Sequence, residues 1–279
     1  ESETARTESA LKQAEASLRA ANDERERAQA VTDFVTGSLS AHSPHSDGRQ
    51  DLTVADAMMQ AVDRINQGEL SDQPERVAHL LEHIAIILHE NGRSSEAVPL
   101  AERSLKLRRD LYGNDHETVL RSLNTLAGLH MTLGHFAEAE PVLEQVVTRY
   151  ERLYADVDHE HLAMALMNLA GVRQQQGHLA EAAPLFERAL EMVRRQFAGK
   201  DEATIVRGLI NLAGIRRDLG KADEAERLYN EALAMSKRLY PGDHPLTAVC
   251  LNNLGSVHQA GEGPKASVPL WEEALQRRK

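Results

Sequence analysis

The sequence has one cysteine, few aromatic residues and no long apolar run. Its 279 residues include a single cysteine, Cys250, so no disulfide can form within the chain. No apolar run approaches the roughly 20 residues that a membrane-spanning helix requires, so we expect no membrane insertion by this chain. The net charge is −11 and no basic block is present. Because nucleic-acid recognition begins with a positive surface, nucleic acid is not an expected partner.

Motifs of common enzymes are missing as well. The His-Glu pair that begins a zinc-protease helix occurs three times, at His89, His116 and His159, but no second histidine completes the site. No nucleophile elbow, phosphate-binding loop or kinase catalytic motif is found. His79 and His83 lie four residues apart but lack a third ligand. We therefore predict no catalytic residue, no cofactor and no metal site.

What the sequence does contain is a repeat. A glycine followed five residues later by alanine returns at separations of 42, 43 and 43 residues, and a fifth, slipped copy starts at about Gly261. The four regular glycines are Gly92, Gly134, Gly177 and Gly220. Apolar residues at helical spacing precede and follow each glycine, which indicates two helices joined at a bend. Each repeat is therefore expected to be a helical hairpin.

Two further sets of residues mark the expected helix ends. Prolines recur at one repeat position, which we assign to the first turn of the second helix because a missing N–H costs little there. These are Pro99, Pro141, Pro184 and Pro269. Aspartates recur in the linkers between hairpins, as expected for N-caps. These are Asp115, Asp158, Asp201 and Asp243, and histidines at the next position in three linkers (His116, His159 and His244) suggest a role in linker geometry.

The repeated residues resemble the tetratricopeptide repeat. The resemblance rests on small residues at Ala127, Ala170, Ala213 and Gly255 and on aromatics at Phe186, Tyr229 and Trp271. The usual period of about 34 residues is exceeded here, and the phrases Leu-Tyr-Gly-Asn-Asp-His and Leu-Asn-Asn-Leu-Gly resemble the kinesin-light-chain subclass. The resemblance implies an all-α, right-handed superhelix of about five helix-turn-helix repeats over residues 71–279.

The first 70 residues follow a different pattern. Residues 1–40 are rich in charge and carry Leu11, Leu18 and Leu39 in a heptad register, which indicates a helical stalk. A weak coiled coil and a single charged helix both fit this pattern. Residues 41–70 are expected to form a loop and a leading helix that starts after Thr53, runs from Val54 to Asn66 and packs on the first repeat.

Short phrases in this region resemble bacterial receptor-type Ser/Thr protein kinases. They begin at Ala30 (Ala-Val-Thr-Asp-Phe-Val-Thr-Gly), Leu52 (Leu-Thr-Val-Ala-Asp) and Arg64 (Arg-Ile-Asn). In that family these elements follow a kinase domain and one membrane span. The resemblance implies a non-catalytic sensory region on the extracytoplasmic, periplasmic side of a membrane-anchored parent. We further hypothesise a homodimer that pairs through the N-terminal helix. A cytoplasmic adaptor without a kinase and a small-ligand sensor are the alternatives.

Polar residues recur on the face that the first helices of such hairpins turn to the concave groove. We predict that this groove holds a protein or peptide ligand through Arg121, Asn124, Asn168, Arg207, Asn211, Arg217, Asn252, Asn253 and His83. An asparagine amide both donates and accepts, so these residues can hold a peptide backbone, as the kinesin-light-chain resemblance implies, or tie neighbouring helices together. Both readings stay open. The arginines would pair with ligand carboxylates.

Overall fold

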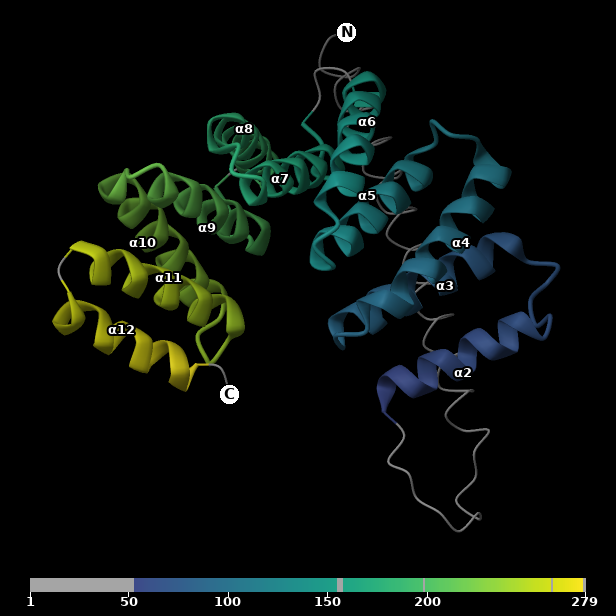
Figure 1. Cartoon of the computed structure of the whole chain (residues 1–279), viewed down its shortest axis with the longest axis horizontal. Coiled ribbons are helices and arrows are strands. Elements are labelled where there is room, and N and C mark those ends of the chain that lie inside the picture. The colour runs from purple at the N-terminus through teal and green to yellow at the C-terminus, as the bar shows by residue number, and fades with distance from the viewer. Residues whose placement is uncertain (1–52, 155–157, 198, 262, 278–279) are drawn as a thin grey trace, which may run out of the picture. The chain divides into compact units, whose positions relative to one another are not determined.

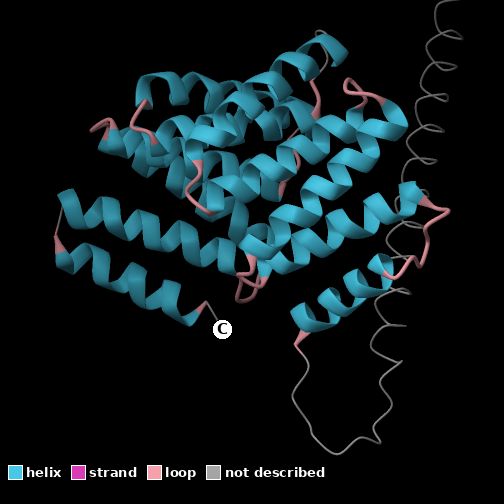
Figure 2. Cartoon of the chain, turned by 45° about the vertical axis from the view of Figure 1, so that its right-hand side comes forward, coloured by secondary structure: helices cyan, strands magenta, loops and turns pink. Residues whose placement is uncertain are grey.

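The computed structural model describes residues 53–154, 158–197, 199–261 and 263–277, and every regular element in these ranges is an α-helix. The helices run from α2 to α12 and are joined by short loops (Figures 1 and 2). The predicted stalk at residues 1–40 lies outside the described residues. The chain divides into two units, one ending at Gly113 and one beginning at Asn114. The boundaries predicted at residues 40 and 70 stay predictions.

The first unit contains three described helices, which are α2 (Val54–Asn66), α3 (Pro74–Glu90) and α4 (Ser94–Tyr112). Helix α2 has the bounds that the sequence predicts, and it packs against α3, which confirms the expected contact with the first hairpin. Its start is fixed by a capping box, in which Thr53 accepts from the Asp56 N–H and the Asp56 carboxylate accepts from the Thr53 N–H.

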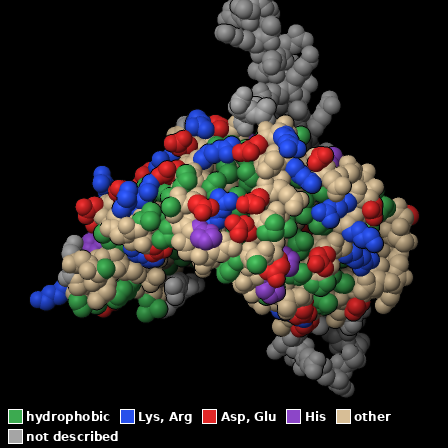
Figure 3. All heavy atoms as spheres, turned by 45° about the horizontal axis from the view of Figure 1, so that its top comes forward, with side chains coloured by type: hydrophobic (Ala, Val, Ile, Leu, Met, Phe, Trp, Pro, Cys, Tyr) green, Lys and Arg blue, Asp and Glu red, His purple; other side chains and the backbone are tan. Residues whose placement is uncertain are grey.

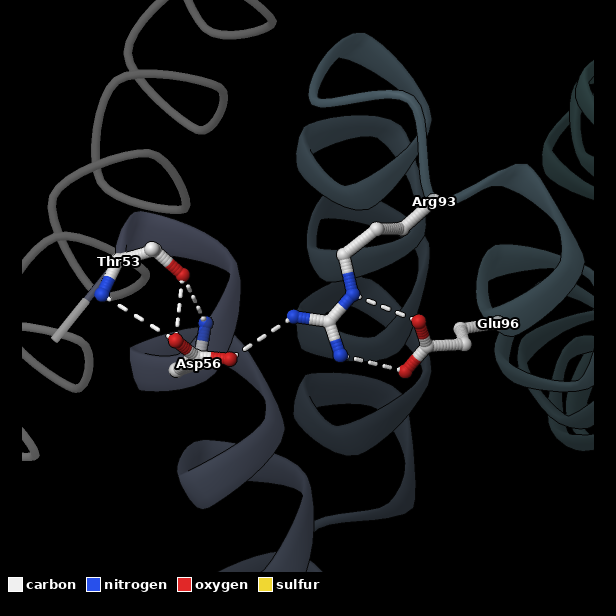
Figure 4. Close-up of polar contacts among 4 residues, drawn as sticks. All are labelled: Thr53, Asp56, Arg93 and Glu96. Atoms are coloured by element: carbon white, nitrogen blue, oxygen red, sulfur yellow. Dashed lines mark hydrogen bonds and ion pairs between the residues drawn. The ribbon is translucent and has the colours of Figure 1, made fainter.

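A charged cluster ties the start of α2 to the bend between α3 and α4 (Figure 4). The Arg93 guanidinium donates to Asp56 at 3.0 Å and to both carboxylate oxygens of Glu96 at 2.6 and 2.7 Å. Hydrogen bonds from Thr53 and Arg93 lower the pKa of Asp56, and the bond from Arg93 lowers that of Glu96. Both carboxyl groups therefore stay ionised well into the acid range.

Helix α2 occupies the place that a second helix takes in a hairpin array. Arg93 reaches Asp56 and Arg103 reaches Asn66 across 37 residues in each case. The same separation joins Arg188 to Glu151 on consecutive second helices of the other unit. The leading helix thus follows the geometry of the repeats although the repeat motif cannot be read in its sequence.

The second unit contains four hairpins. Their helices are α5 (Glu117–Thr132), α6 (Phe136–Tyr154), α7 (Glu160–Gln175), α8 (Leu179–Phe197), α9 (Ala203–Asp218), α10 (Ala222–Leu239), α11 (Pro245–Gly261) and α12 (Pro264–Gln276). Together with α3 and α4 they make five hairpins, which confirms the predicted all-α repeat fold. We call α3, α5, α7, α9 and α11 the first helices and their partners the second helices. Each second helix of this unit except α12 also packs against the following first helix.

The bend glycines adopt the left-handed backbone conformation that favours glycine. Gly92, Gly134, Gly177 and Gly220 have φ between 76° and 83° and lie two residues before their second helix. The prediction for the fifth copy was wrong, because Gly261 ends α11 and the left-handed glycine is Gly263, directly before α12. Measured from the start of the second helix, the fifth repeat is in step with the others.

The recurring prolines do not lie in the first helical turn, as the sequence suggested. Pro99, Pro141, Pro184 and Pro269 are each the sixth residue of their helix. A proline there removes one N–H bond to the carbonyl of the second residue. All four prolines are exposed, and so are the residues whose carbonyls lose this bond. Water can therefore satisfy the carbonyl, which explains why the array accepts proline at this position.

The linker aspartates are not the N-caps that the sequence predicted. The caps are the following residues, His116, His159 and Glu202, whose side chains accept backbone N–H groups at 3.1 to 3.3 Å. His244 likewise accepts from the backbone of Leu246 at the start of α11.

Three of the aspartates instead bind arginines toward the end of the next second helix along the chain. Arg195 donates to both oxygens of Asp158, Arg238 does the same to Asp201, and Arg149 lies 3.7 Å from Asp115. Two parallel charge-assisted hydrogen bonds satisfy the carboxylate better than one N–H bond can, so the carboxylate turns away from the helix terminus.

Arg173 of α7 and Arg216 of α9 each tie their own first helix to the second helices on both sides. We call these two residues the bridging arginines. Arg173 in α7 pairs with Glu140 and Glu144 of α6 and with Glu181 of α8. Arg216 in α9 pairs with Glu187 of α8 and Glu224 of α10. Each bridging arginine therefore links three helices by ion pairs.

Candidate functional site

The first helices of the second unit share a stripe that their second helices leave uncovered. Its members lie five, nine, twelve and sixteen residues after each N-cap, which places them on one helical face. They are Arg121, Thr125, Gly128 and Thr132; Met164, Asn168, Gly171 and Gln175; Arg207, Asn211, Gly214 and Asp218; and Val249, Asn253, Ser256 and Ala260. All except Gly214 are at least partly exposed, and neighbouring first helices contact one another. We call this continuous surface the first-helix stripe.

The first-helix stripe carries few charges, whereas the second helices are covered with ion pairs. Consecutive second helices are joined by Arg188 with Glu151, Arg194 with Glu231 and Lys237 with Glu273. Basic and acidic side chains are interspersed on the face drawn in Figure 3. The stripe offers amides, glycines and small hydroxyls instead. It therefore suits contacts to a backbone or to mixed side chains better than recognition of one strong charge.

Two of the predicted asparagines, Asn124 and Asn168, hold neighbouring first helices together. The Asn168 amide of α7 donates to the Asn124 side-chain oxygen of α5 at 3.0 Å, and Asn124 is only 8% exposed. A buried amide left without this partner would cost about 1 to 3 kcal/mol. Between these two residues the structure therefore supports the reading that the amides hold adjacent helices together.

The other predicted asparagines are arranged differently. Asn211 and Asn252 are exposed and Asn253 is half-buried, and none of their side chains makes a hydrogen bond within the part of the chain that the structure describes. The Asn252 backbone carbonyl accepts from the Trp271 indole at 3.2 Å, and this bond does not use the side-chain amide. These three amides retain their hydrogen-bonding capacity for a ligand.

The predicted arginines differ from one another in their partners. Arg217 donates twice to Asp218, which also accepts from Gln174 of α7, so Arg217 already has a carboxylate partner. Arg121 and Arg207 make no ion pair with any residue in the described ranges, and Arg207 is exposed. Arg207 and Asn211 lie four residues apart on α9 and thus on the same side of that helix. This places a cation beside an unpaired amide.

His83 lies in α3 of the first unit, and the structure gives no geometry that joins it to the stripe. Its ring lies 4.3 Å from that of His79 in an edge-on arrangement. Among the described residues no group of three or more His, Cys, Asp or Glu side chains could hold a metal ion. The Cys250 thiol is buried in α11, and burial raises its pKa to about 12, so it is a poor nucleophile.

The glycines of the stripe have different surroundings. A Cβ at Gly171 would lie 3.2 Å from the Met131 side chain of α5, so helix packing explains this glycine. A Cβ at Gly128 would meet nothing within 4 Å. The tightest site is Gly255 in α11, where a Cβ would lie 2.5 Å from Trp271 Nε1. That close packing requires glycine where the earlier hairpins have alanine.

Sequence reasoning missed two apolar members of the stripe as binding residues. Met164 is 42% exposed and Val249 is 39% exposed, at the helix position that holds arginine in α5 and α9. The sequence contains a pattern that could have identified them, because Arg121, Met164, Arg207 and Val249 each lie five residues after their N-cap. They alternate arginine with an apolar residue along successive first helices.

The comparisons with known proteins agree with this geometry. A tetratricopeptide repeat profile matches residues 76–152 and 204–279, and a second tetratricopeptide profile matches residues 162–199. The chain belongs to the tetratricopeptide repeat family. Tetratricopeptide proteins bind protein or peptide partners, and their repeat fold is typically non-catalytic. No described helix is long and apolar enough to cross a bilayer.

Several known proteins resemble the chain. Nephrocystin-3 of Xenopus laevis is 29% identical over 99 residues, which are 35% of this chain and 8% of that protein, so the chain spans a small part of this relative. A putative kinesin light chain from Podosopora anserina has a TM-score of 0.58 at 22% identity, covering 74% of this chain and 96% of the other. BtubC (BKLC) from P. vanneervenii has a TM-score of 0.64 at 20% identity, covering 80% and 89%. At these identities the two solved structures show a likeness of fold alone.

A fourth similarity has a wider coverage. A Rap protein in complex with competence and sporulation factor has a TM-score of 0.63 at 12% identity, covering 91% of this chain and 76% of the other. At this identity the likeness concerns the fold alone. The predicted resemblance to kinesin-light-chain repeats is thus confirmed at the level of the fold, and the resemblance to receptor kinases stays a prediction.

Proposed function

We propose that this tetratricopeptide array is a binding scaffold that holds an extended segment of a partner protein on the first-helix stripe. The observation that carries the proposal is the pair of Arg207 and Asn211 on α9, both exposed and both without a partner among the described residues. The asparagine amide supplies a donor and an acceptor for a peptide backbone, and the arginine supplies a cation for a nearby carboxylate. No step of catalysis is required of the chain.

Apolar residues on the helices either side of this pair indicate which side chains the bound segment carries. Met164 of α7 and Val249 of α11 are exposed at the position that Arg207 holds on α9. Since α7 and α11 both contact α9, a segment that crosses the three helices meets an apolar, a basic and an apolar side chain in turn. We therefore expect the bound segment to carry an acidic residue flanked by apolar ones.

A retention experiment tests the scaffold. The immobilised protein is compared with a variant carrying Arg207→Ala and Asn211→Ala, and retained proteins are identified by mass spectrometry. The matched control removes the same residue types from α10 with Arg227→Ala and Asn230→Ala. A partner lost with the α9 changes and kept with the α10 changes supports the proposal. Equal retention by all three proteins would contradict it.

We further propose that the scaffold is the sensory region of a bacterial receptor Ser/Thr kinase. What supports this is the order of the phrases that begin at Ala30, Leu52 and Arg64 and lead into long repeats. The proposed location is the extracytoplasmic, periplasmic side of a membrane-anchored parent. Determining the coding sequence upstream of Glu1 decides the matter, because a kinase domain and a membrane span must precede it. Their absence would favour a cytoplasmic adaptor.

Ligand binding would act on the kinase by changing its pairing. We propose that residues 1–40 form the contact between two copies, as their heptad pattern suggests. Sedimentation of residues 1–279 is compared with that of residues 41–279. A dimer that disappears with the deletion supports this role of the N-terminal segment, and an unchanged molar mass would rule it out.

A further inference from the structure

The first-helix stripe repeats two rows of side chains along α7, α9 and α11. The first row is Met164, Arg207 and Val249, five residues after each N-cap, and all three are exposed. The second row has an asparagine on every one of these helices, nine residues after the N-cap, and the amides of Asn211 and Asn253 make no hydrogen bond among the described residues. A ligand that crosses the three helices therefore meets the same two helix positions once per helix.

Side-chain contacts show how closely neighbouring first helices pack. A Cβ at Gly208 of α9 would lie 3.2 Å from the Met167 side chain of α7. The Gln174 amide of α7 donates to Asp218 of α9 at 3.3 Å, and α9 also packs against α11. Helices in such direct contact have axes about 8 to 10 Å apart. Each row of the stripe therefore advances by about 8 to 10 Å from one first helix to the next.

One regular backbone conformation has the same period as this stripe. In a polyproline II helix every third residue returns to the same face, after an advance of about 9 Å. In a β-strand, residues on one face recur about every 6.6 Å, and the residue three positions away points to the opposite face. A polyproline II segment can therefore place every third side chain on successive first helices, whereas a β-strand cannot.

The asparagine row distinguishes this conformation from a bound α-helix. Residues seven apart on an α-helix share a face and are about 10.5 Å apart, which is close to the spacing of the stripe. An α-helix, however, bonds its own N–H groups to its own carbonyls, so Asn211 and Asn253 would meet no free backbone group. A polyproline II segment has no internal hydrogen bonds. Both amides can therefore bond to its backbone, at equivalent residues three positions apart.

We propose that the first-helix stripe binds a polyproline II segment that carries an acidic residue with a large apolar residue three positions before it and another three positions after it. The acidic residue pairs with Arg207, and the apolar residues pack on Met164 and Val249. Since α5 contacts α7, a second acidic residue three positions beyond the one at Met164 reaches Arg121. The inference rests on the binding function proposed above and adds the conformation and spacing of the ligand.

The residues of the chain that the structure leaves undescribed do not supply such a segment. Residues 1–52 contain a single proline, Pro44, and none of their acidic residues has a large apolar residue at both third neighbours. Every other undescribed stretch is at most three residues long. The occupant of the stripe is therefore a segment that residues 1–279 do not contain.

The probe is a fluorescent peptide of thirteen residues. It has glutamate at positions 1, 7 and 13, leucine at positions 4 and 10 and proline elsewhere, so it matches Arg121, Met164, Arg207 and Val249 in either direction. The control peptide has the same composition, but its leucines are at positions 5 and 9, which turns them away from the face of the glutamates. In anisotropy titrations of the 279-residue protein the probe should bind saturably and the control at least about tenfold more weakly, because its leucines lose their apolar contacts.

Variants of the protein show where the probe binds. Arg207→Ala with Asn211→Ala should weaken binding by about tenfold or more, because an ion pair and an amide contact are lost. Arg227→Ala with Asn230→Ala on α10 should leave it unchanged. Arg207→Glu should restore binding to a probe with lysine at position 7, since the charges are then opposite again. Absence of saturable binding by the wild-type protein overturns the inference, and so does an affinity that the α9 changes leave unaltered.

The outcomes also separate this inference from the binding function on which it rests. Equal affinities for the probe and the control peptide, both lost with Arg207→Ala and Asn211→Ala, would overturn the polyproline II spacing and leave the scaffold function intact. A partner that the retention experiment loses with the α9 changes, together with no binding of the probe, would have the same meaning. Equal retention by all three proteins would contradict the scaffold function itself.

Discussion

At the scale of single residues, the array stays regular because each variation is matched by a neighbour. Gly255 replaces the alanine of earlier hairpins where Trp271 replaces the smaller Leu143, Phe186 and Tyr229 at the same helix position. Ser267 is buried where the other second helices have alanine, and its hydroxyl donates to Gln259 at 2.7 Å. The position of a residue in its helix therefore determines which neighbour it contacts, and a change at one position is accompanied by a change in that neighbour.

Two helical glycines give a matched pair of substitutions. Gly255→Ala should destabilise the protein by about 1 to 3 kcal/mol, because the new Cβ would overlap Trp271 and overpacking has costs of this size. Gly128→Ala should stabilise it by up to about 1 kcal/mol, because its Cβ meets nothing and alanine is the better helix former. Urea unfolding monitored by circular dichroism measures both. Changes of the same sign would contradict this account of the packing.

The histidine cap of α7 makes part of the stability depend on pH. His159 accepts the N–H of His161 and stacks on Tyr154 with ring centroids 3.6 Å apart. Burial and the nearby His161 lower the pKa of His159, while Glu117 and Glu160 act in the opposite direction. Because the folded-state pKa is below the unfolded one, the stabilisation is present above about pH 6.5 and is lost as the pH falls from there.

His159→Asn tests this dependence, since asparagine caps helices without titrating. Between pH 7.5 and pH 5 the wild-type protein should lose about 1 kcal/mol more than the variant, the value of one N-cap. Urea unfolding at several pH values provides the comparison. Parallel pH profiles of the two proteins would show that the cap does not titrate in this range.

At the scale of helices, ion pairs connect elements that are distant in sequence. The bridging arginine Arg216 is mostly buried between Glu187 of α8 and Glu224 of α10. Partly buried pairs of this kind are weakly screened and contribute more than exposed ones. By contrast, the linker pairs such as Arg238 with Asp201 are more exposed and lower the pKa of the aspartate without much burial.

Arg216→Met should therefore destabilise the array, by about 1 to 2 kcal/mol, because two carboxylates lose a charged donor while the aliphatic stem is kept. The control on the same helix is Arg207→Met, which should change the free energy of unfolding by less than about 0.5 kcal/mol as expected for an exposed residue. Urea unfolding at 0.1 M salt measures both. Equal losses would mean that the ion pairs of Arg216 contribute nothing.

The sequence predicts the helices well and their side-chain contacts less well. The bounds of α2 and the hairpin bends follow from local periodicity and capping residues, which the sequence displays directly. The caps were misassigned because Asp158 and Asp201 bind arginines 37 residues away, and such pairs depend on how hairpins stack. For the same reason the Asn124–Asn168 bond could not be distinguished from a peptide contact before the register of α5 and α7 was seen.

At the scale of the whole molecule, stability is expected to vary along the array. Hairpins contact their neighbours in sequence, so local stability is a sum over nearest-neighbour interfaces. Within the second unit, α8 is covered by both α7 and α9, whereas among the described helices α12 packs chiefly on α11. The last hairpin thus has fewer stabilising contacts than the middle ones.

Hydrogen exchange should show this gradient. The amides of α12 are expected to exchange at least about tenfold faster than those of α8, since local opening of a terminal element requires fewer contacts to break. Mass spectrometry of peptic fragments resolves the two helices. Equal protection of α8 and α12 would mean that the second unit unfolds as one cooperative block.

The bridging arginines also bear on how such a chain can change its length during evolution. Arg173 and Arg216 are 43 residues apart, and the glutamates that they bind on the preceding helix, Glu144 and Glu187, are 43 residues apart as well. Loss of one 43-residue block between them would place Glu144 opposite Arg216, which repeats the glutamate–arginine pairing, and Val147 opposite Gly208, where Leu190 lies in the parent. Recombination that removes one such block would therefore keep both the glutamate–arginine pair and the apolar contact to glycine at the new interface.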